Sequence, residues 1–253
     1  MARPRRFLLA GNPDSGPPEL VPTDREHALR VLRVSPGDRL EGLDGQGRAH
    51  GLEVVRAGRR KLELALTGEL REEPAPGAPG APLPWIEVRA PLPKGGRAEE
   101  MLGVLTQLGV ARLVPLITRR SEVQARGSSE GRRERLERAA AEALKQSGRL
   151  WMPEISAKQE LTSDSALAGT CLRLDPRAPG GLREALEGLG GGPWTREAPL
   201  ALLVGPEGGW SPEEEAELDA AGVARGRLGP HVLRLEAAAA AGLAVLVEAL
   251  QAR

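Results

Sequence analysis

A stretch rich in proline, alanine and glycine divides the chain into two parts with different sequence patterns. Residues 72–84 read Glu-Glu-Pro-Ala-Pro-Gly-Ala-Pro-Gly-Ala-Pro-Leu-Pro. Proline has no backbone N–H and a fixed φ angle, so this composition cannot sustain a helix or a central strand. We therefore predict a linker over residues 72–84, between one domain at residues 1–71 and a second domain at residues 85–253.

The part before the linker has the alternation that is typical of short strands. Apolar and polar residues alternate over 40–43, 49–55 and 61–67, and the turn formers Pro36-Gly37-Asp38 and Asp44-Gly45 separate these segments. Such short strands joined by turns predict a small, mostly β barrel.

After the linker, strand patterns alternate with helix patterns. This alternation favours an α/β fold in which helices cover both faces of a parallel sheet. The predicted strands are 86–90, 112–117, 170–174 and 200–204, the predicted helices are about 98–108, 130–147, 212–221 and 237–250, and 228–238 is strand-like until it enters the last helix.

The composition restricts the class of protein. With 253 residues and 40% apolar residues, the chain has enough apolar side chains to bury a core. No apolar stretch is long enough to span a bilayer, and Phe7–Ala10 is too short for a signal peptide, so we expect a cytoplasmic protein without a membrane partner. A single cysteine, Cys171, and three scattered histidines exclude a disulfide framework and predict no metal site.

A glycine-rich turn lies between a predicted strand and a clearly marked helix start. Three of the five residues at 205–209 are glycine, so the backbone there can take positive φ angles and approach a ligand closely. Ser211 is a good N-cap, Pro212 suits the first helical position, and Glu214 completes a capping box. The pattern predicts a strand, a ligand-binding turn and a helix in succession.

The residues around this turn argue against phosphate as its ligand. A phosphate-binding P-loop carries a lysine and a serine or threonine at the helix start, whereas this turn carries Glu207 and precedes three glutamates at 213–215. The dinucleotide fingerprint G-x-G-x-x-G is also missing from the turn. A ligand without phosphates therefore fits better.

Together with a second segment, the turn resembles a known family. That segment, Leu228 to Ala238, reads Leu-Gly-Pro-His-Val-Leu-Arg-Leu-Glu-Ala-Ala. The two motifs are similar to those of the RsmE-type 16S ribosomal RNA uridine-N3 methyltransferases of the SPOUT superfamily. Further matches occur in the expected order: Arg5-Arg6-Phe7, His27 with Val31-Leu32-Arg33, Gly37-Asp38, Lys94-Gly95, Leu108-Gly109-Val110, Pro115-Leu116, and Glu142 with Gln146-Ser147-Gly148-Arg149.

The resemblance implies both a fold and a cofactor. It implies a PUA-like RNA-binding barrel followed by a SPOUT domain whose parallel sheet contains a deep trefoil knot, and a homodimer packed through the knotted domains. It also implies that three loops bind S-adenosylmethionine, at 205–209, at 228–238 and near 172–175. The implied cofactor-binding residues are Leu172, Leu174, Leu203, Val204, Gly205, Pro206, Glu207, Gly208, Gly209, Leu228, Gly229, Leu233, Leu235 and Ala238.

The implied reaction is methylation of a uridine in the 16S ribosomal RNA of the small ribosomal subunit. Uridine N3 carries a proton at neutral pH, so the reaction needs a base or a cation that stabilises the uridinate. We assign Arg234 as the candidate cation and Glu236 as the candidate base. Arginines and a lysine are expected to bind RNA phosphates: Arg5, Arg6, Arg30, Arg33, Lys94, Arg119 and Arg149.

Three positions depart from the family pattern, and two other functions stay open. The chain has His231 where the family usually has arginine, Ala237 where it has threonine, and Gln107 where it often has glutamate. One alternative is a PUA-type RNA-binding protein whose second domain has lost catalysis. The other is an α/β nucleotide-binding enzyme that holds phosphates at the glycine turn.

Overall fold

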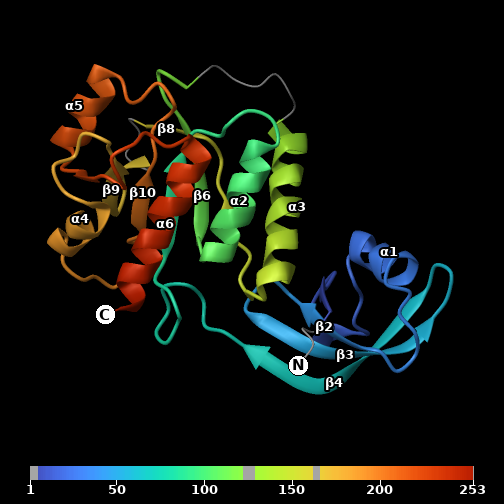
Figure 1. Cartoon of the computed structure of the whole chain (residues 1–253). Helices are drawn as coiled ribbons and strands as arrows, with labels where there is room; N and C mark the ends of the chain where they lie inside the picture. Colours follow the sequence, from blue (N-terminus) through green and yellow to red (C-terminus); the bar gives the residue numbers. More distant parts are fainter. Residues whose placement is uncertain (1–4, 122–128, 162–165, 253) are drawn as a thin grey trace. The chain divides into compact units, whose positions relative to one another are not determined.

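The computed structural model describes residues 5–121, 129–161 and 166–252, and the chain divides into two compact units (Figure 1). Unit 1 consists of Met1–Ala75 with Leu144–Met152, and unit 2 of Pro76–Ala143 with Pro153–Arg253. The first division falls inside the predicted linker. The grouping of 144–152 with unit 1 was not predicted, and it follows from packing, because Leu144 and Leu150 share a buried cluster with Leu43.

Unit 1 is built on a four-stranded sheet in the order β1-β2-β3-β4. Its elements are β1 (Arg6–Leu8), the short 3-10 helix η1 (Pro13–Ser15), α1 (Pro22–Arg30), β2 (Arg39–Leu43), β3 (Arg48–Ala57) and β4 (Leu62–Glu72). β1 pairs with β2 in parallel, and the other pairs are antiparallel. The predicted strands are present but longer than expected, whereas β1 and α1 were missed. α1 was missed because its sequence has little apolar periodicity: its buried residues are Asp24 and Ala28, and only one of these is apolar.

A buried carboxylate helps to hold unit 1 together. Asp24 of α1 accepts a hydrogen bond from the Leu8 N–H at 2.7 Å and forms an ion pair with Lys145 Nζ at 2.6 Å. The two contacts join α1, β1 and the segment 144–152 around one side chain. Charge-assisted bonds of this kind are stronger than neutral ones, so Asp24 fixes where α1 lies on the sheet.

Unit 2 is an α/β domain, as predicted. Its elements are β5 (Ile86–Ala90), α2 (Arg97–Leu108), β6 (Arg112–Ile117), α3 (Ser129–Ser147, whose last residues belong to unit 1), β7 (Glu154–Ile155), β8 (Gln159–Glu160), β9 (Thr170–Leu174), α4 (Leu182–Gly188), β10 (Leu200–Leu203), α5 (Pro212–Ala220), β11 (Ala224–Gly226) and α6 (Leu235–Gln251). The strand order is β11-β9-β10-β5-β6-β7, β8 also pairs with β6, and all these pairs are parallel.

Helices cover both faces of this sheet, which explains why every residue of β5 and β10 is buried. On one face α6 packs against α2, α4, β5 and β10. Leu202 of β10 faces this layer, because a Cβ added to Gly242 of α6 would lie 2.8 Å from its Cδ2. On the other face Ala201 and Leu203 share a buried cluster with Leu218 of α5. None of the described helices is long and apolar enough to cross a membrane.

The segment before α6 differs from the prediction. We expected a strand-like stretch over 228–238, but the strand is β11, which ends at Gly226, and the loop that follows leads into α6 at Leu235. The Gly229-Pro230 pair interrupts any strand there, since proline cannot donate to a sheet. Arg234 is extended (φ −62°, ψ 151°) and forms the N-cap of α6.

The packing of β11 against α4 leads to a prediction about Gly226. A Cβ at this position would lie 2.5 Å from Leu182 Cα and 2.9 Å from Leu182 N, and backbone atoms cannot move aside cheaply. Gly226→Ala should lower the free energy of unfolding by about 1–3 kcal/mol, as overpacking does. Gly103→Ala is the matched control, since Gly103 lies inside α2 with nothing within 4 Å of the new Cβ.

Urea unfolding followed by tryptophan fluorescence measures both changes. The control should be stabilised by about 0.5–1 kcal/mol, because alanine is the better helix former. Equal stability of Gly226→Ala and the unchanged protein would contradict the close approach of β11 to α4.

Candidate functional site

A pocket of about 420 Å³ lies at the carboxyl ends of β9, β10 and β11. Its walls are the loops that follow these strands, at 174–177, 204–210 and 226–233, with the first turn of α6. Adjacent parallel strands bring their carboxyl ends to one edge of the sheet, which is where α/β proteins bind ligands. The volume is within the range of small-molecule sites.

The glycine turn after β10 is held in shape by Trp210. The Gly209 N–H donates to the Pro206 carbonyl at 2.8 Å, and Gly209 has a φ of +69°, which favours glycine. A Cβ at Gly205 would lie 3.0 Å from Cε2 of the Trp210 ring. Trp210 is itself buried in the cluster between the sheet and α5. Glycine at 205 and 209 therefore lets the turn close over this ring.

The helix start after the turn is the predicted capping box. The Ser211 side chain accepts a hydrogen bond from the Glu214 N–H, and Glu214 Oε2 accepts one from the Ser211 N–H at 2.7 Å. Glu214 is buried, and its Oε1 also accepts the Arg119 N–H at 2.7 Å. The same carboxylate thus caps α5 and holds the loop after β6 against it.

Arg120 fixes the outer side of the turn. Its Nη1 donates to the Gly208 carbonyl at 2.9 Å and to the Trp210 carbonyl at 3.1 Å, and the side chain lines the pocket. Its neighbour Arg119 was predicted as an RNA contact, whereas Arg120 was not predicted as a site residue. The one sequence signal for Arg120 was its place just beyond a predicted strand.

An ionic network of Asp175, Arg177 and Glu215 forms another part of the pocket wall. Asp175 is buried, and its carboxylate accepts a hydrogen bond from the backbone N–H of Arg177 at 2.8 Å. The backbone N–H of Asp175 donates to the Gly226 carbonyl at 3.1 Å. The Arg177 guanidinium contacts both Asp175 and Glu215, and these hydrogen bonds, Glu215 first, raise the pKa of Arg177. The loops after β9 and β11 are therefore tied to each other and to α5.

Comparison with known proteins identifies the family. The model of a family described as RNA methyltransferase domain matches residues 80–247. The chain belongs to this RNA methyltransferase family. A ribosomal RNA small subunit methyltransferase E of Mycobacterium bovis is 31% identical over 246 residues, covering 94% of this chain and 88% of the relative. The corresponding protein of Synechocystis is 29% identical and covers 89% of this chain and 71% of the relative.

Two solved structures have the same fold as this RNA methyltransferase over nearly the whole chain. A ribosomal RNA small subunit methyltransferase E from Neisseria gonorrhoeae, bound to S-adenosylmethionine, has a TM-score of 0.76 and 25% identity, covering 96% of this chain and 97% of its own. A methyltransferase structure from Legionella pneumophila with bound cofactor has a TM-score of 0.78 and 25% identity, covering 97% of each chain.

All but two of the predicted cofactor residues of the methyltransferase line the pocket. The lining includes Leu174, Val204, Gly205, Pro206, Glu207, Gly208, Gly209, Leu228, Gly229, Leu233, Leu235 and Ala238. Leu172 and Leu203 do not line it, because both are fully buried in the sheet. Leu203 instead packs in the buried cluster that includes Leu218 of α5.

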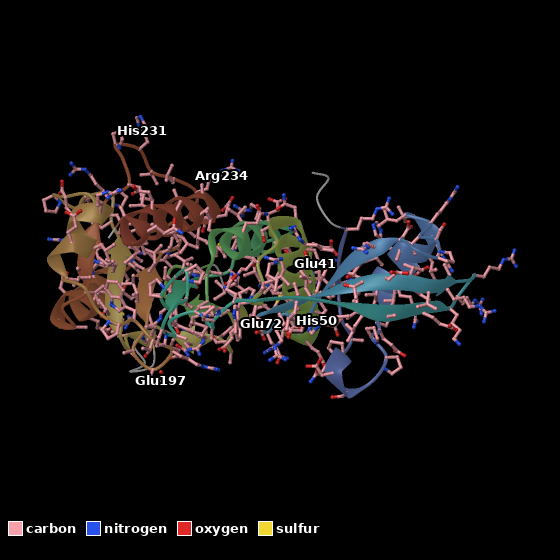
Figure 2. The ribbon with its side chains drawn as sticks, turned by 90° about the horizontal axis from the view of Figure 1, so that it is seen from below. Glu41, His50, Glu72, Glu197, His231 and Arg234 are labelled. Atoms are coloured by element: carbon pink, nitrogen blue, oxygen red, sulfur yellow. The ribbon has the colours of Figure 1, made fainter. Side chains whose placement is uncertain are left out.

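The two predicted catalytic residues lie in different surroundings. Arg234 is exposed, and Figure 2 shows its side chain and that of His231 projecting outward from the loop before α6. Glu236 is only 18% exposed and lies 3.5 Å from Arg97 Nη1, which is 3.8 Å from Glu207. The buried Oε2 of Glu236 has no hydrogen-bond partner among the described residues. Arg97, which was not predicted as a site residue, joins the glycine turn to α6.

Three of the predicted RNA contacts of unit 1, Arg5, Arg6 and Arg33, differ in their exposure and in their partners. Arg6 is 16% exposed, pairs with Glu41 at 2.7 Å and donates to the Lys145 carbonyl at 3.2 Å. Arg6 is therefore held inside the unit. Arg5 lies 3.8 Å from Asp38, while Arg33 is exposed with a φ of +49°.

The other predicted RNA contacts also differ in exposure. Arg30 is exposed and pairs with Glu26 at 2.6 Å, and Lys94 and Arg119 are exposed. Burial lowers the pKa of Arg149 to about 10, so the guanidinium stays charged at neutral pH. Within the described ranges no group of three or more His, Cys, Asp or Glu side chains suits a metal ion.

The double role of Glu214 leads to a stability prediction. Glu214→Ala removes the acceptor of two backbone N–H groups, at Ser211 and Arg119, and should lower the free energy of unfolding by about 1–3 kcal/mol. Glu217→Ala on the same helix is the control, since Glu217 is exposed, and should change it by less than about 0.5 kcal/mol. Urea unfolding measures both, and equal effects would show that the buried carboxylate contributes no more than a surface one.

Proposed function

We propose that this methyltransferase uses S-adenosylmethionine to methylate N3 of a uridine in the 16S ribosomal RNA of the small ribosomal subunit. The observation that carries the proposal is the pocket made by the three loops after β9, β10 and β11, in a chain that aligns along nearly its full length with methyltransferases solved with this cofactor. The choice of substrate rests on relatives that are named ribosomal RNA small subunit methyltransferase E.

The residues of the pocket fit this cofactor. Leu174, Val204, Leu228 and Leu235 provide apolar surface for the adenine ring, and the glycine turn exposes backbone at close range. The carboxylates of Asp175, Glu207 and Glu215 around the pocket favour a cationic ligand group such as the sulfonium. When bound, the cofactor supplies an activated methyl group.

A nucleotide phosphate fits the pocket poorly. The arginines on its lining are already occupied: Arg120 bonds two carbonyls of the turn, Arg177 contacts two carboxylates, and Arg227 donates to the Ala178 and Pro179 carbonyls. Three carboxylates on the same lining would repel a phosphate. The pocket therefore disfavours the nucleotide-binding alternative.

Glu236 and Arg234 are proposed to handle the proton of uridine N3. Glu236 follows Leu235 of the pocket wall, and its Oε2 has no hydrogen-bond partner among the described residues, which supports a role as the acceptor of that proton. Arg97 holds the other oxygen by an ion pair at 3.5 Å, which limits how the carboxylate can turn. The guanidinium of Arg234 is exposed at the N-cap of α6, and its proposed role is to stabilise the uridinate that forms as the proton leaves.

We propose the finer features of the fold and assembly on the same family resemblance. These are a PUA-like barrel in unit 1, a deep trefoil knot in the parallel sheet of unit 2, a homodimer formed through unit 2, and a cytoplasmic location. The TM-scores of 0.76 and 0.78 with cofactor-bound methyltransferases support a shared topology, including the rare knot.

A direct assay tests the reaction. We expect purified protein to transfer tritium from labelled S-adenosylmethionine to small ribosomal subunits that lack their own methyl groups, with 3-methyluridine as the labelled nucleoside. A different labelled nucleoside would overturn the uridine assignment. Cofactor binding by calorimetry with no transfer to any RNA would instead favour the alternative of an RNA-binding protein without catalysis, to which His231 and Ala237 point.

The proposed role of Glu236 predicts a slower methyl transfer with unchanged affinity for the cofactor. Glu236→Gln should lower the rate of transfer by about 100-fold or more while S-adenosylmethionine affinity stays within about twofold, because general-base contributions are typically of this size. Glu217→Gln on the exposed side of α5 is the control, with an unchanged rate. A normal rate for Glu236→Gln would place the base elsewhere.

A further inference from the structure

We propose that a basic hollow on unit 1 binds the phosphodiester backbone of the RNA substrate. The basic hollow has a volume of about 330 Å³ and is lined by Pro22, Arg25, Glu26, Leu29, Arg30, Arg59 and Arg60. Of these, only Arg30 was named as an RNA contact from the sequence. The inference rests on the proposed function, since it takes RNA to be the substrate.

The fold of unit 1 brings the two sides of the basic hollow together. On α1, positions 22, 25, 26 and 29 recur at helical spacing and form one face. Across from it, Arg59 and Arg60 lie in the turn between β3 and β4, which the Gly58 N–H closes by donating to the Lys61 carbonyl at 2.8 Å. Figure 1 shows this hairpin end beside α1.

Apolar packing keeps these two sides in place. Leu29 of α1 packs against the same buried cluster as Ala57 and Leu62, the residues at the ends of β3 and β4. The arginines at 59 and 60 are therefore carried by a turn whose base is anchored in the core. The lining is preorganised rather than formed by two independent loops, which lowers the entropic cost of binding.

The charges in the basic hollow are not balanced by the protein. Glu26 is the single acid of the lining, and it is already paired with Arg30 at 2.6 Å. Within the part of the chain that the structure describes, no carboxylate forms an ion pair with Arg25, Arg59 or Arg60. Guanidinium groups gathered without counter-charges repel one another, so an anionic ligand would relieve a cost that the fold leaves in place.

The chemistry of the lining favours a phosphodiester backbone over other anions. Guanidinium groups bind phosphate oxygens in a bidentate manner, and several around one hollow suit successive phosphates of a strand. Pro22 and Leu29 add apolar surface that a ribose can cover and that a lone ion does not need.

A pair of double variants separates the basic hollow from the overall charge of unit 1. Arg59→Ala with Arg60→Ala removes two positive charges from the lining. Arg39→Ala with Lys61→Ala removes two as well, but neither residue lines the basic hollow, and each is exposed and pairs with a glutamate, at 3.5 and 2.7 Å. Urea unfolding of both variants checks that they fold.

Fluorescence anisotropy with protein-free 16S ribosomal RNA, over a series of salt concentrations, measures the result. We expect the variant of the basic hollow to bind roughly tenfold more weakly, with a salt slope reduced by about 1–2, and the control to change less than about twofold. Inorganic phosphate at millimolar concentration should compete only weakly. Equal losses in both variants, or no loss in the first, would overturn the site.

Further readouts identify which proposal has failed. S-adenosylmethionine affinity should be unchanged in both variants. If the unchanged protein transfers no methyl group but the variant of the basic hollow still loses RNA affinity, the proposed reaction fails and the basic hollow stands. A variant that loses affinity for the assembled subunit but keeps its affinity for free RNA would assign the basic hollow to a ribosomal protein and overturn the RNA proposal.

Discussion

The parallel pairing of four neighbouring strands, β11, β9, β10 and β5, is the constraint on which the rest of unit 2 depends. β10 pairs in parallel with β9 on one side and β5 on the other, with Leu200 opposite both Thr170 and Ile86. β11 then pairs with β9 in the same direction. Because these strands end at the same edge, the loops after β9, β10 and β11 meet there, and the pocket follows from their meeting.

The protein uses its arginines in two different ways. Around the pocket of unit 2 they hold loops in place, as Arg120 does through two carbonyls and Arg177 through two carboxylates. In the basic hollow of unit 1, Arg25, Arg59 and Arg60 line one cavity, and in the described residues no carboxylate pairs with them. Composition alone does not separate these roles, since each is an arginine in an arginine-rich chain. The partner of each guanidinium decides whether it stabilises the fold or remains available to a ligand.

Glu214 and Arg97 show how a few polar contacts shape the pocket at long range. Glu214 completes the cap of α5 and also accepts the Arg119 N–H, although the two positions are 95 residues apart. Arg97, at the start of α2, lies within 4 Å of Glu207 on the glycine turn and of Glu236 on α6. These contacts connect elements that are distant along the chain, and they hold the walls of the pocket in fixed positions relative to one another.

The sequence by itself determined the local elements of the site. The strands 86–90, 112–117 and 170–174, the glycine turn and the cap formed by Ser211 and Glu214 were all predicted with their bounds, because each depends on residues within a few positions of one another. Elements with weak local patterns were missed, such as α1, α4 and β11. Only the tertiary structure decided that Arg97 and Arg120 join the site, that Leu172 and Leu203 belong to the core, and that 144–152 packs with unit 1. These outcomes depend on which strands pair and which faces pack, and such contacts between distant residues leave no local pattern.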